Sequence, residues 1–140
     1  MKVIAFDPFV NTTDLDVKLC PKDEVLQNAD YISLHLPLIK GEPIPMGTPE
    51  FEKMKKNAIV INCARGGVVD EVALLNALKT GKIAGAGLDV FVNEPTTEAQ
   101  KELIDHPRVS VTPHIGASTN EAQDRIGIEI AQKIIDAIKK

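Results

Sequence analysis

Strand-like and helix-like segments alternate along the whole chain, and this alternation restricts the possible folds more than any other feature of the sequence. Five short apolar segments, rich in β-branched residues, are typical of strands and span residues 2–6, 31–36, 58–63, 85–90 and 108–112. Helical patterns follow at residues 21–28, 48–55, 70–81, 97–104 and 118–140. Such alternation predicts an α/β fold of three layers, in which a parallel sheet lies between helices on both faces and the crossovers are right-handed.

The helix ends carry recognisable capping residues. Thr48 and Asp70 are predicted to be N-caps, and Ser118 with Glu121 three residues later has the spacing of a capping box. Gly81 is expected to end the helix that begins at Asp70. Two apolar stripes should face the core: Val72, Leu74, Leu75 and Leu78 in that helix, and Ile126, Ile130, Ile134 and Ile138 in the last one.

The composition excludes several classes of protein. A chain of 140 residues with 44% hydrophobic content can form the core of one domain, so residues 1–140 are expected to be a single domain. The net charge of −4 argues against binding to nucleic acid or to an anionic membrane, because both bind clustered lysine and arginine. No apolar run reaches the roughly 20 residues that span a bilayer, and Asp7 comes too early for a signal peptide.

Cysteine and histidine usage adds two expectations. Cys20 and Cys63 are far apart and form neither a CxxC pair nor a cluster with the three histidines. We therefore expect no metal site, and two reduced thiols in a cytoplasmic protein.

The residues that follow the strands carry most of the reactive groups. In an open parallel sheet, ligands bind outside the carboxyl ends of the strands. The segments at that edge are Asp7-Pro8, His35-Leu36-Pro37, Ala64-Arg65-Gly66-Gly67, Asp89-Val90 and Pro113-His114-Ile115-Gly116. They predict a rim of polar side chains and glycine turns on one side of the molecule.

Three residues near this rim form a chemical set. Arg65 precedes two glycines, and its guanidinium could bind a carboxylate through two parallel hydrogen bonds. His114 could act as a general acid or base near neutral pH. Glu94 could bind the other imidazole nitrogen and orient the ring.

Structural interpretations of the same residues stay open. Arg65 could be a surface residue that pairs with Asp70 or Glu71, and His114 alone could be a structural histidine. Turn, loop or capping roles are the alternatives for Asp7, Asp89 and Glu94. His35 is interpreted as structural, His106 as a surface residue and Cys63 as packing at a strand end.

Three ordered motifs resemble the D-isomer-specific 2-hydroxyacid dehydrogenases, and most of all their D-3-phosphoglycerate branch. They are Ile61-Asn62-Cys63-Ala64-Arg65-Gly66-Gly67-Val68-Val69-Asp70, then Ala86-Gly87-Leu88-Asp89-Val90-Phe91 with Glu94-Pro95, and Thr112-Pro113-His114-Ile115-Gly116-Ala117-Ser118-Thr119 with Glu121-Ala122-Gln123. The resemblance covers nearly the whole chain, except for the loop at residues 40–47.

The resemblance implies a role for each motif residue. His114 would exchange the proton with the substrate oxygen, Glu94 would orient and charge that histidine, and Arg65 would bind the substrate carboxylate. The cofactor would be NAD, with Asp7 on the adenosine ribose and Asp89 at the nicotinamide end. Pro37, Cys63, Ala64 and Gly116 would also contact the cofactor.

The sequence lacks one part of this family's cofactor site. No G-x-G-x-x-G motif occurs in the 140 residues, so the helix N-terminus that would hold the pyrophosphate is not present in them. The family's substrate domain is also missing. Without the central strand of a Rossmann sheet, we expect the gap to close into a five-stranded sheet of flavodoxin-like order 2-1-3-4-5, covered by the last helix folding back.

Two functional hypotheses follow. In the first, the chain is a fragment of an NAD-dependent 2-hydroxyacid dehydrogenase, acting on a small substrate such as 3-phosphoglycerate, and is inactive without a complementing chain. In the second, it is an engineered stand-alone module that neither catalyses nor binds a cofactor. We expect a monomer, with a dimer as the alternative.

A phosphate-accepting receiver is excluded because the third strand ends in Asn62-Cys63-Ala64, and a flavin site is disfavoured because Asn11-Thr12-Thr13 contains no glycine.

Overall fold

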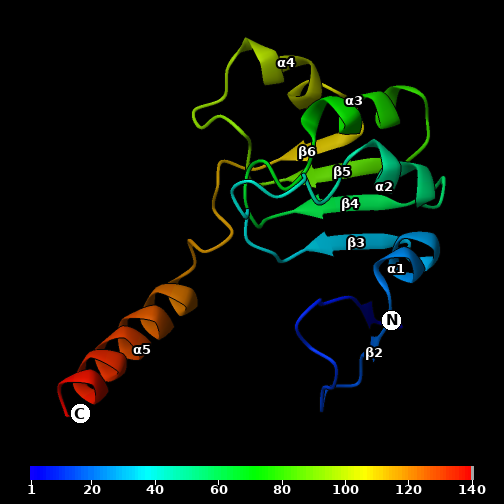
Figure 1. Cartoon of the computed structure of the whole chain (residues 1–140). Helices are drawn as coiled ribbons and strands as arrows, with labels where there is room; N and C mark the ends of the chain where they lie inside the picture. Colours follow the sequence, from blue (N-terminus) through cyan, green and yellow to red (C-terminus); the bar gives the residue numbers. More distant parts are fainter. Residues whose placement is uncertain (140) are drawn as a thin grey trace.

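The computed structural model describes residues 1–139 and shows strands and helices in alternation (Figure 1). Within these residues the elements, in chain order, are β1 (Ile4–Ala5), β2 (Lys18–Leu19), α1 (Lys22–Asn28), β3 (Tyr31–Leu34), α2 (Thr48–Lys53), β4 (Ile59–Asn62), α3 (Glu71–Lys79), β5 (Gly85–Leu88), α4 (Glu98–Ile104), β6 (Val109–Val111) and α5 (Asn120–Ile138).

The main sheet contains four parallel strands in the order β3-β4-β5-β6. The strands pair in chain order, each linked to the next by a helix, and Tyr31 of β3 lies opposite Ile59 of β4. All four strands therefore end at the same edge of the sheet. The predicted α/β class and the parallel pairing are confirmed.

Helices cover one face of this sheet, not two. Ile32, Val60 and Ala86 lie side by side in register and are buried in the same core as residues from α1 to α4. The helical members of that core include Leu26, Phe51, Leu74, Leu78 and Leu103.

The alternate residues of the strands face the other side, which is far more open. Tyr31 and Ser33 of β3 are exposed, and a shallow depression there is lined by residues that include Ile59, Ile61, Gly85, Gly87 and Ser110. The prediction of a three-layer arrangement is therefore wrong for the described residues: the sheet has one packed face and one open face.

The predicted closure of the sheet is also wrong. The expected order 2-1-3-4-5 placed the first strand between the strands that begin at Tyr31 and Ile59, but these two pair directly with each other. β1 pairs instead with β2 in a separate two-stranded parallel sheet, which lies beyond β3 in Figure 1. The sequence did not indicate β2 because this strand has two residues, too few to show a period.

Several element ends differ from the predictions by one residue or more. α2 is capped by Gly47, whose N–H donates to the Glu50 carboxylate at 3.0 Å, and Thr48 is already helical. α5 is capped by Thr119 rather than Ser118. Asp70 caps α3 as predicted, since its carboxylate accepts hydrogen bonds from the Val72 and Ala73 amides at 3.0 Å each. The Asp70 helix ends before Gly81, whose φ of +69° suits glycine.

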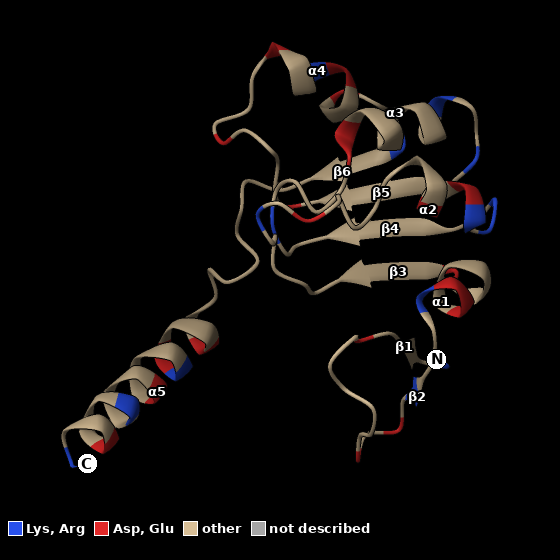
Figure 2. Cartoon of the chain, viewed as in Figure 1, with Lys and Arg blue, Asp and Glu red and all other residues tan. Residues whose placement is uncertain are grey.

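The last helix does not fold back over the sheet. α5 contains no buried residue, and its isoleucines are exposed, so the predicted covering role is wrong. Figure 1 shows α5 extending away from the strands, and Figure 2 shows charged residues of both signs along it. The stripe of isoleucines gives the helix an apolar side but does not determine which surface that side will contact.

The packing of α3 generates a stability prediction. Leu74 is completely buried, whereas Val72, which the sequence pattern placed inside, is 80% exposed. Leu74→Ala should lower the free energy of unfolding by about 2–5 kcal/mol because it opens a cavity, and Val72→Ala should change it by less than about 0.5 kcal/mol. Urea denaturation followed by circular dichroism measures both, and equal losses would contradict this orientation of the helix.

Candidate functional site

The site is centred on a hydrogen bond between the side chains of two loops. Glu94 lies in the loop after β5, and His114 lies in the loop after β6. The Oε2 atom of Glu94 is 2.6 Å from Nδ1 of His114, a hydrogen-bonding distance. The His114 side chain is 52% exposed, so its ring is open to solvent while one nitrogen is held. The structure thus brings together two of the three residues in the predicted chemical set.

The backbone of its own loop fixes the other oxygen of Glu94. The Phe91 N–H donates to Glu94 Oε1 at 2.9 Å. This bond, followed by the bond to His114, holds the pKa of Glu94 below its ordinary value. The carboxylate therefore stays charged at neutral pH and can favour an imidazole that carries a proton on Nδ1.

Asp89 holds the loop that carries His114. Its side chain is 3% exposed, and Oδ1 accepts hydrogen bonds from the Thr112 hydroxyl at 2.5 Å and the Ile115 N–H at 2.9 Å. Oδ2 accepts a third hydrogen bond from the Gly116 N–H at 2.7 Å. Burial raises the pKa of this carboxyl, but the three hydrogen bonds outweigh burial and leave the pKa below its ordinary value.

The backbone of His114 needs this support. Its φ of +54° lies in the left-handed region, which a residue with a β-carbon rarely adopts. The bonds from Asp89 to the two following amides offset the cost of that conformation. Asp89 was predicted to meet the nicotinamide end of a cofactor; in this structure its two oxygens accept hydrogen bonds from Thr112, Ile115 and Gly116.

Arg65 follows β4 in a turn that is shaped by a residue the sequence reasoning missed. The buried Asn62 side chain donates to the Arg65 carbonyl and accepts from the Ala64 N–H, each at 3.1 Å. The Arg65 guanidinium is exposed and donates to the Ala64 carbonyl at 2.6 Å, so neither Asp70 nor Glu71 is its hydrogen-bond partner. A single amide at the end of an apolar strand was the available signal for Asn62.

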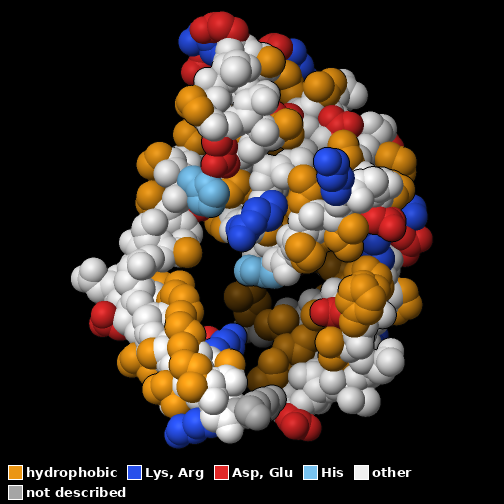
Figure 3. Space-filling model, turned by 60° about the vertical axis from the view of Figure 1, so that its left-hand side comes forward, with side chains coloured by type: hydrophobic (Ala, Val, Ile, Leu, Met, Phe, Trp, Pro, Cys, Tyr) orange, Lys and Arg blue, Asp and Glu red, His pale blue; other side chains and the backbone are white. Residues whose placement is uncertain are grey.

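Gly66 joins the arginine turn to the Glu94 loop. A β-carbon at position 66 would lie 1.8 Å from the carbonyl oxygen of Phe91, so the two backbones can meet only at glycine. Gly116 is bound to Asp89, and a β-carbon there would lie 3.0 Å from Oδ2 of Asp89 and 3.7 Å from Cβ of Cys63. Contacts therefore link the loops that follow β4, β5 and β6. Figure 3 shows histidine, basic and acidic side chains gathered on one face, beside the opening toward α5.

Most of the other predicted rim residues are exposed to solvent. Asp7 is exposed beyond β1, and its Oδ1 accepts the Phe9 N–H at 2.8 Å, the geometry of a local turn. Pro37 is exposed after β3, and His35 bonds through Nε2 to the Ser33 hydroxyl at 2.8 Å. Cys63 is exposed and Ala64 is half-buried at the end of β4.

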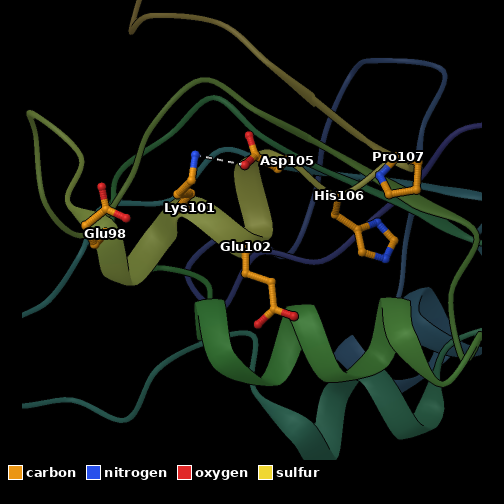
Figure 4. A pocket seen from close by; sticks show the side chains of 6 residues that line it. All are labelled: Glu98, Lys101, Glu102, Asp105, His106 and Pro107. Atoms are coloured by element: carbon orange, nitrogen blue, oxygen red, sulfur yellow. Dashed lines mark ion pairs between the residues drawn. The ribbon is translucent and has the colours of Figure 1, made fainter.

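A second depression, at α4, is not a good candidate. Its lining residues Glu98, Lys101, Glu102, Asp105, His106 and Pro107 belong to one helix and the loop after it (Figure 4). Lys101 and Asp105 pair with each other at 3.2 Å, and Glu102 pairs with Lys79 of α3. Within residues 1–139, no group of three histidine, cysteine or acidic residues could hold a metal ion, and no helix is both long and apolar enough to cross a bilayer.

The close approach at Gly66 gives a prediction. Gly66→Ala should lower the free energy of unfolding by about 1–3 kcal/mol, because the new methyl group must push the Phe91 backbone away. The displaced loop should also disturb the contact between Glu94 and His114, visible in the NMR signals of the imidazole. Gly127→Ala is the control, since a β-carbon there meets nothing within 4 Å. Equal stability of Gly66→Ala and the parent chain would count against the geometry.

The lowered pKa of Asp89 gives a pH dependence. A depressed native pKa adds stability above the unfolded value, about 3.9, and this stability is lost as the pH falls through the native pKa. Asp89→Asn should cost about 1–3 kcal/mol at pH 7, because an amide cannot accept all three hydrogen bonds.

The Asp89→Asn variant should lose less free energy of unfolding than the parent chain between pH 7 and pH 3, as measured by urea titration. Asp105→Asn, at an exposed pair, should follow the parent chain at both pH values. Parallel losses on acidification in the parent chain and Asp89→Asn would contradict the assignment.

The chain is similar to curated proteins over nearly all of its length. The chain is 46% identical over 135 residues to "Hydroxypyruvate reductase" of Thermotoga maritima, covering 96% of this chain and 44% of the relative. It is 43% identical over 142 residues to human "D-3-phosphoglycerate dehydrogenase", covering 99% of this chain and 26% of the relative. The chain thus spans less than half the length of either curated relative.

Solved structures and a family model also match most of this chain. The glyoxylate reductase of Paecilomyes thermophila superposes with a TM-score of 0.88 at 36% identity, over 100% of this chain and 43% of that one. The NAD-complexed D-isomer-specific 2-hydroxyacid dehydrogenase of Lactobacillus delbrueckii ssp. bulgaricus gives 0.82 at 35% identity, over 97% and 46%. The model of the "D-isomer specific 2-hydroxyacid dehydrogenase, NAD binding domain" matches residues 1–116, which include Arg65, Glu94 and His114. The chain therefore belongs to the D-isomer-specific 2-hydroxyacid dehydrogenase family, as part of its NAD-binding domain.

Proposed function

We propose that this chain provides the acid–base half of an NAD-dependent 2-hydroxyacid dehydrogenase, as one truncated NAD-binding domain over residues 1–140. The observation that carries the proposal is the 2.6 Å contact between Glu94 and Nδ1 of His114, next to the turn that presents Arg65. A histidine held at one nitrogen by a charged carboxylate is the arrangement that general acid–base catalysis uses.

The proposed roles follow from the free atoms of the site. With Nδ1 bound to Glu94, Nε2 of His114 is the nitrogen left to exchange a proton with the substrate oxygen. Glu94 stabilises the imidazolium that forms when Nε2 takes up that proton. The exposed guanidinium of Arg65 binds the substrate carboxylate and so orients the neighbouring carbon and oxygen.

The residues of this chain fit the two ends of NAD but not its centre. NAD, when bound, supplies the hydride chemistry of such a reaction. Asp7 is exposed after β1 and would bind the adenosine ribose, and exposed Pro37, Cys63 and Gly116, with half-buried Ala64, would also contact the cofactor. Asp89, which also holds the His114 loop, would meet the nicotinamide end. The 140 residues contain no glycine-rich loop for the pyrophosphate, so we propose that the chain alone binds NAD weakly or not at all.

We further propose that the chain alone is inactive and that another segment or chain completes the site. The names of its relatives point to hydroxypyruvate or 3-phosphoglycerate as the class of substrate. The two free cysteines support a cytoplasmic location, and we expect a monomer in solution, with a dimer as the alternative. The competing hypothesis is an engineered stand-alone module that neither catalyses nor binds a cofactor; the flavodoxin-like strand order expected for it is not the order found.

A chimera tests the proposal. Residues 1–140 replace the matching segment of the Thermotoga maritima relative, and hydroxypyruvate reduction is followed by loss of NADH absorbance. The chimera should reduce hydroxypyruvate, and the 140-residue chain alone should not. The substitution His114→Gln in the chimera should lower kcat by about 10²–10⁴-fold. His106→Gln is the control, because His106 lies at α4. A folded chimera that binds NADH but has no activity, or one that His114→Gln leaves unchanged, would refute the proposal.

A further inference from the structure

Glu71 makes a contact outside its own helix that points toward the site. It occupies the first turn of α3, and its Oε1 accepts the Val92 N–H at 2.7 Å, across 21 positions of the sequence. The preceding amide, Phe91 N–H, is bound by Glu94. Two carboxylates, one from α3 and one from the loop itself, therefore hold two consecutive amides.

This contact fixes the loop from a rigid element. Glu71 follows the N-cap Asp70, and α3 is anchored in the core by the completely buried Leu74 and Leu78. The segment is buried at Phe91 but open to solvent beyond it, because Val92 and Glu94 are exposed. The position of Phe91 and Val92 in turn sets where the Glu94 carboxylate lies, since one oxygen of Glu94 is bound to Phe91 and the other to His114.

We propose that Glu71 is a positioning residue, which places the Glu94 carboxylate on Nδ1 of His114 by holding the Val92 amide. The inference rests on the proposed acid–base role of Glu94 and His114. Glu71 itself binds the loop backbone and neither Arg65 nor His114, so it acts through Glu94. Its removal should loosen the orientation of the imidazole and not the fold of α3, which retains its cap.

Three substitutions of Glu71 separate the effect of its hydrogen-bond acceptor from the effect of its negative charge. Glu71→Ala removes both. Glu71→Asp keeps the charge near the helix N-terminus but is one methylene shorter, so it cannot reach Val92. Glu71→Gln loses the charge and keeps an oxygen that can accept the same hydrogen bond. Glu98→Ala is the matched control, because Glu98 is the first-turn acid of α4.

Two NMR readouts on the 140-residue chain test the contact and its consequence. Hydrogen exchange of the Val92 amide should be about tenfold faster or more in Glu71→Ala and Glu71→Asp, much less affected in Glu71→Gln, and unchanged in Glu98→Ala. The imidazole nitrogen signals of His114 should show the Nδ1–H form in the parent chain and in Glu71→Gln, and a mixture of tautomers in the other two Glu71 variants. In the chimera, the same two variants should lower kcat by about 10- to 100-fold with little change in KM.

The outcomes distinguish this inference from the proposed function. Faster exchange at Val92 with an unchanged His114 tautomer would make Glu71 a merely structural residue and overturn the inference. Equal behaviour of Glu71→Gln and Glu71→Ala would do the same. Glu94→Gln is the reference for the proposed function: if it leaves both the His114 signals and chimera activity unchanged, the acid–base pair itself is refuted, whatever Glu71 does.

Discussion

The in-register parallel pairing of β4, β5 and β6 is the constraint on which the rest of the site depends. Because these strands run in the same direction, the turns that carry Arg65, Asp89 and His114 leave the sheet at one edge. Close packing between the turns completes the arrangement, most clearly where Gly66 lies against Phe91. The chemistry of the site is thus a product of sheet topology first and of individual side chains second.

Hydrogen bonds from carboxylates to backbone amides are the means by which the loops keep their shape. Asp89 binds the amides after His114, Glu94 binds Phe91, and Glu71 binds Val92. A carboxylate binds an amide more strongly than a neutral acceptor does. The exposed loops therefore need few apolar contacts to hold a defined geometry, which leaves their outer surface open to a ligand.

The sequence predicted local structure where a physical signal was strong and failed where the answer depended on distant surfaces. The Asp70 cap and the inward positions of Leu74 and Leu78 could be predicted because they depend on one helix. The motif around Arg65, Glu94 and His114 indicated the family. The β2 strand was missed because two residues show no period. The position of α5 was wrong because an apolar stripe does not identify the surface that it will contact, and Asn62 was missed because its partners lie in its own backbone turn.

The left-handed backbone at His114 places two requirements on one position. A glycine there would adopt φ of +54° without strain, but it would bring no imidazole; a histidine brings the imidazole and resists the conformation. Position 114 is therefore a point at which backbone stability and the proposed acid–base role favour different amino acids. The buried Asp89 binds the two amides that follow and so allows a histidine, rather than a glycine, to occupy this position.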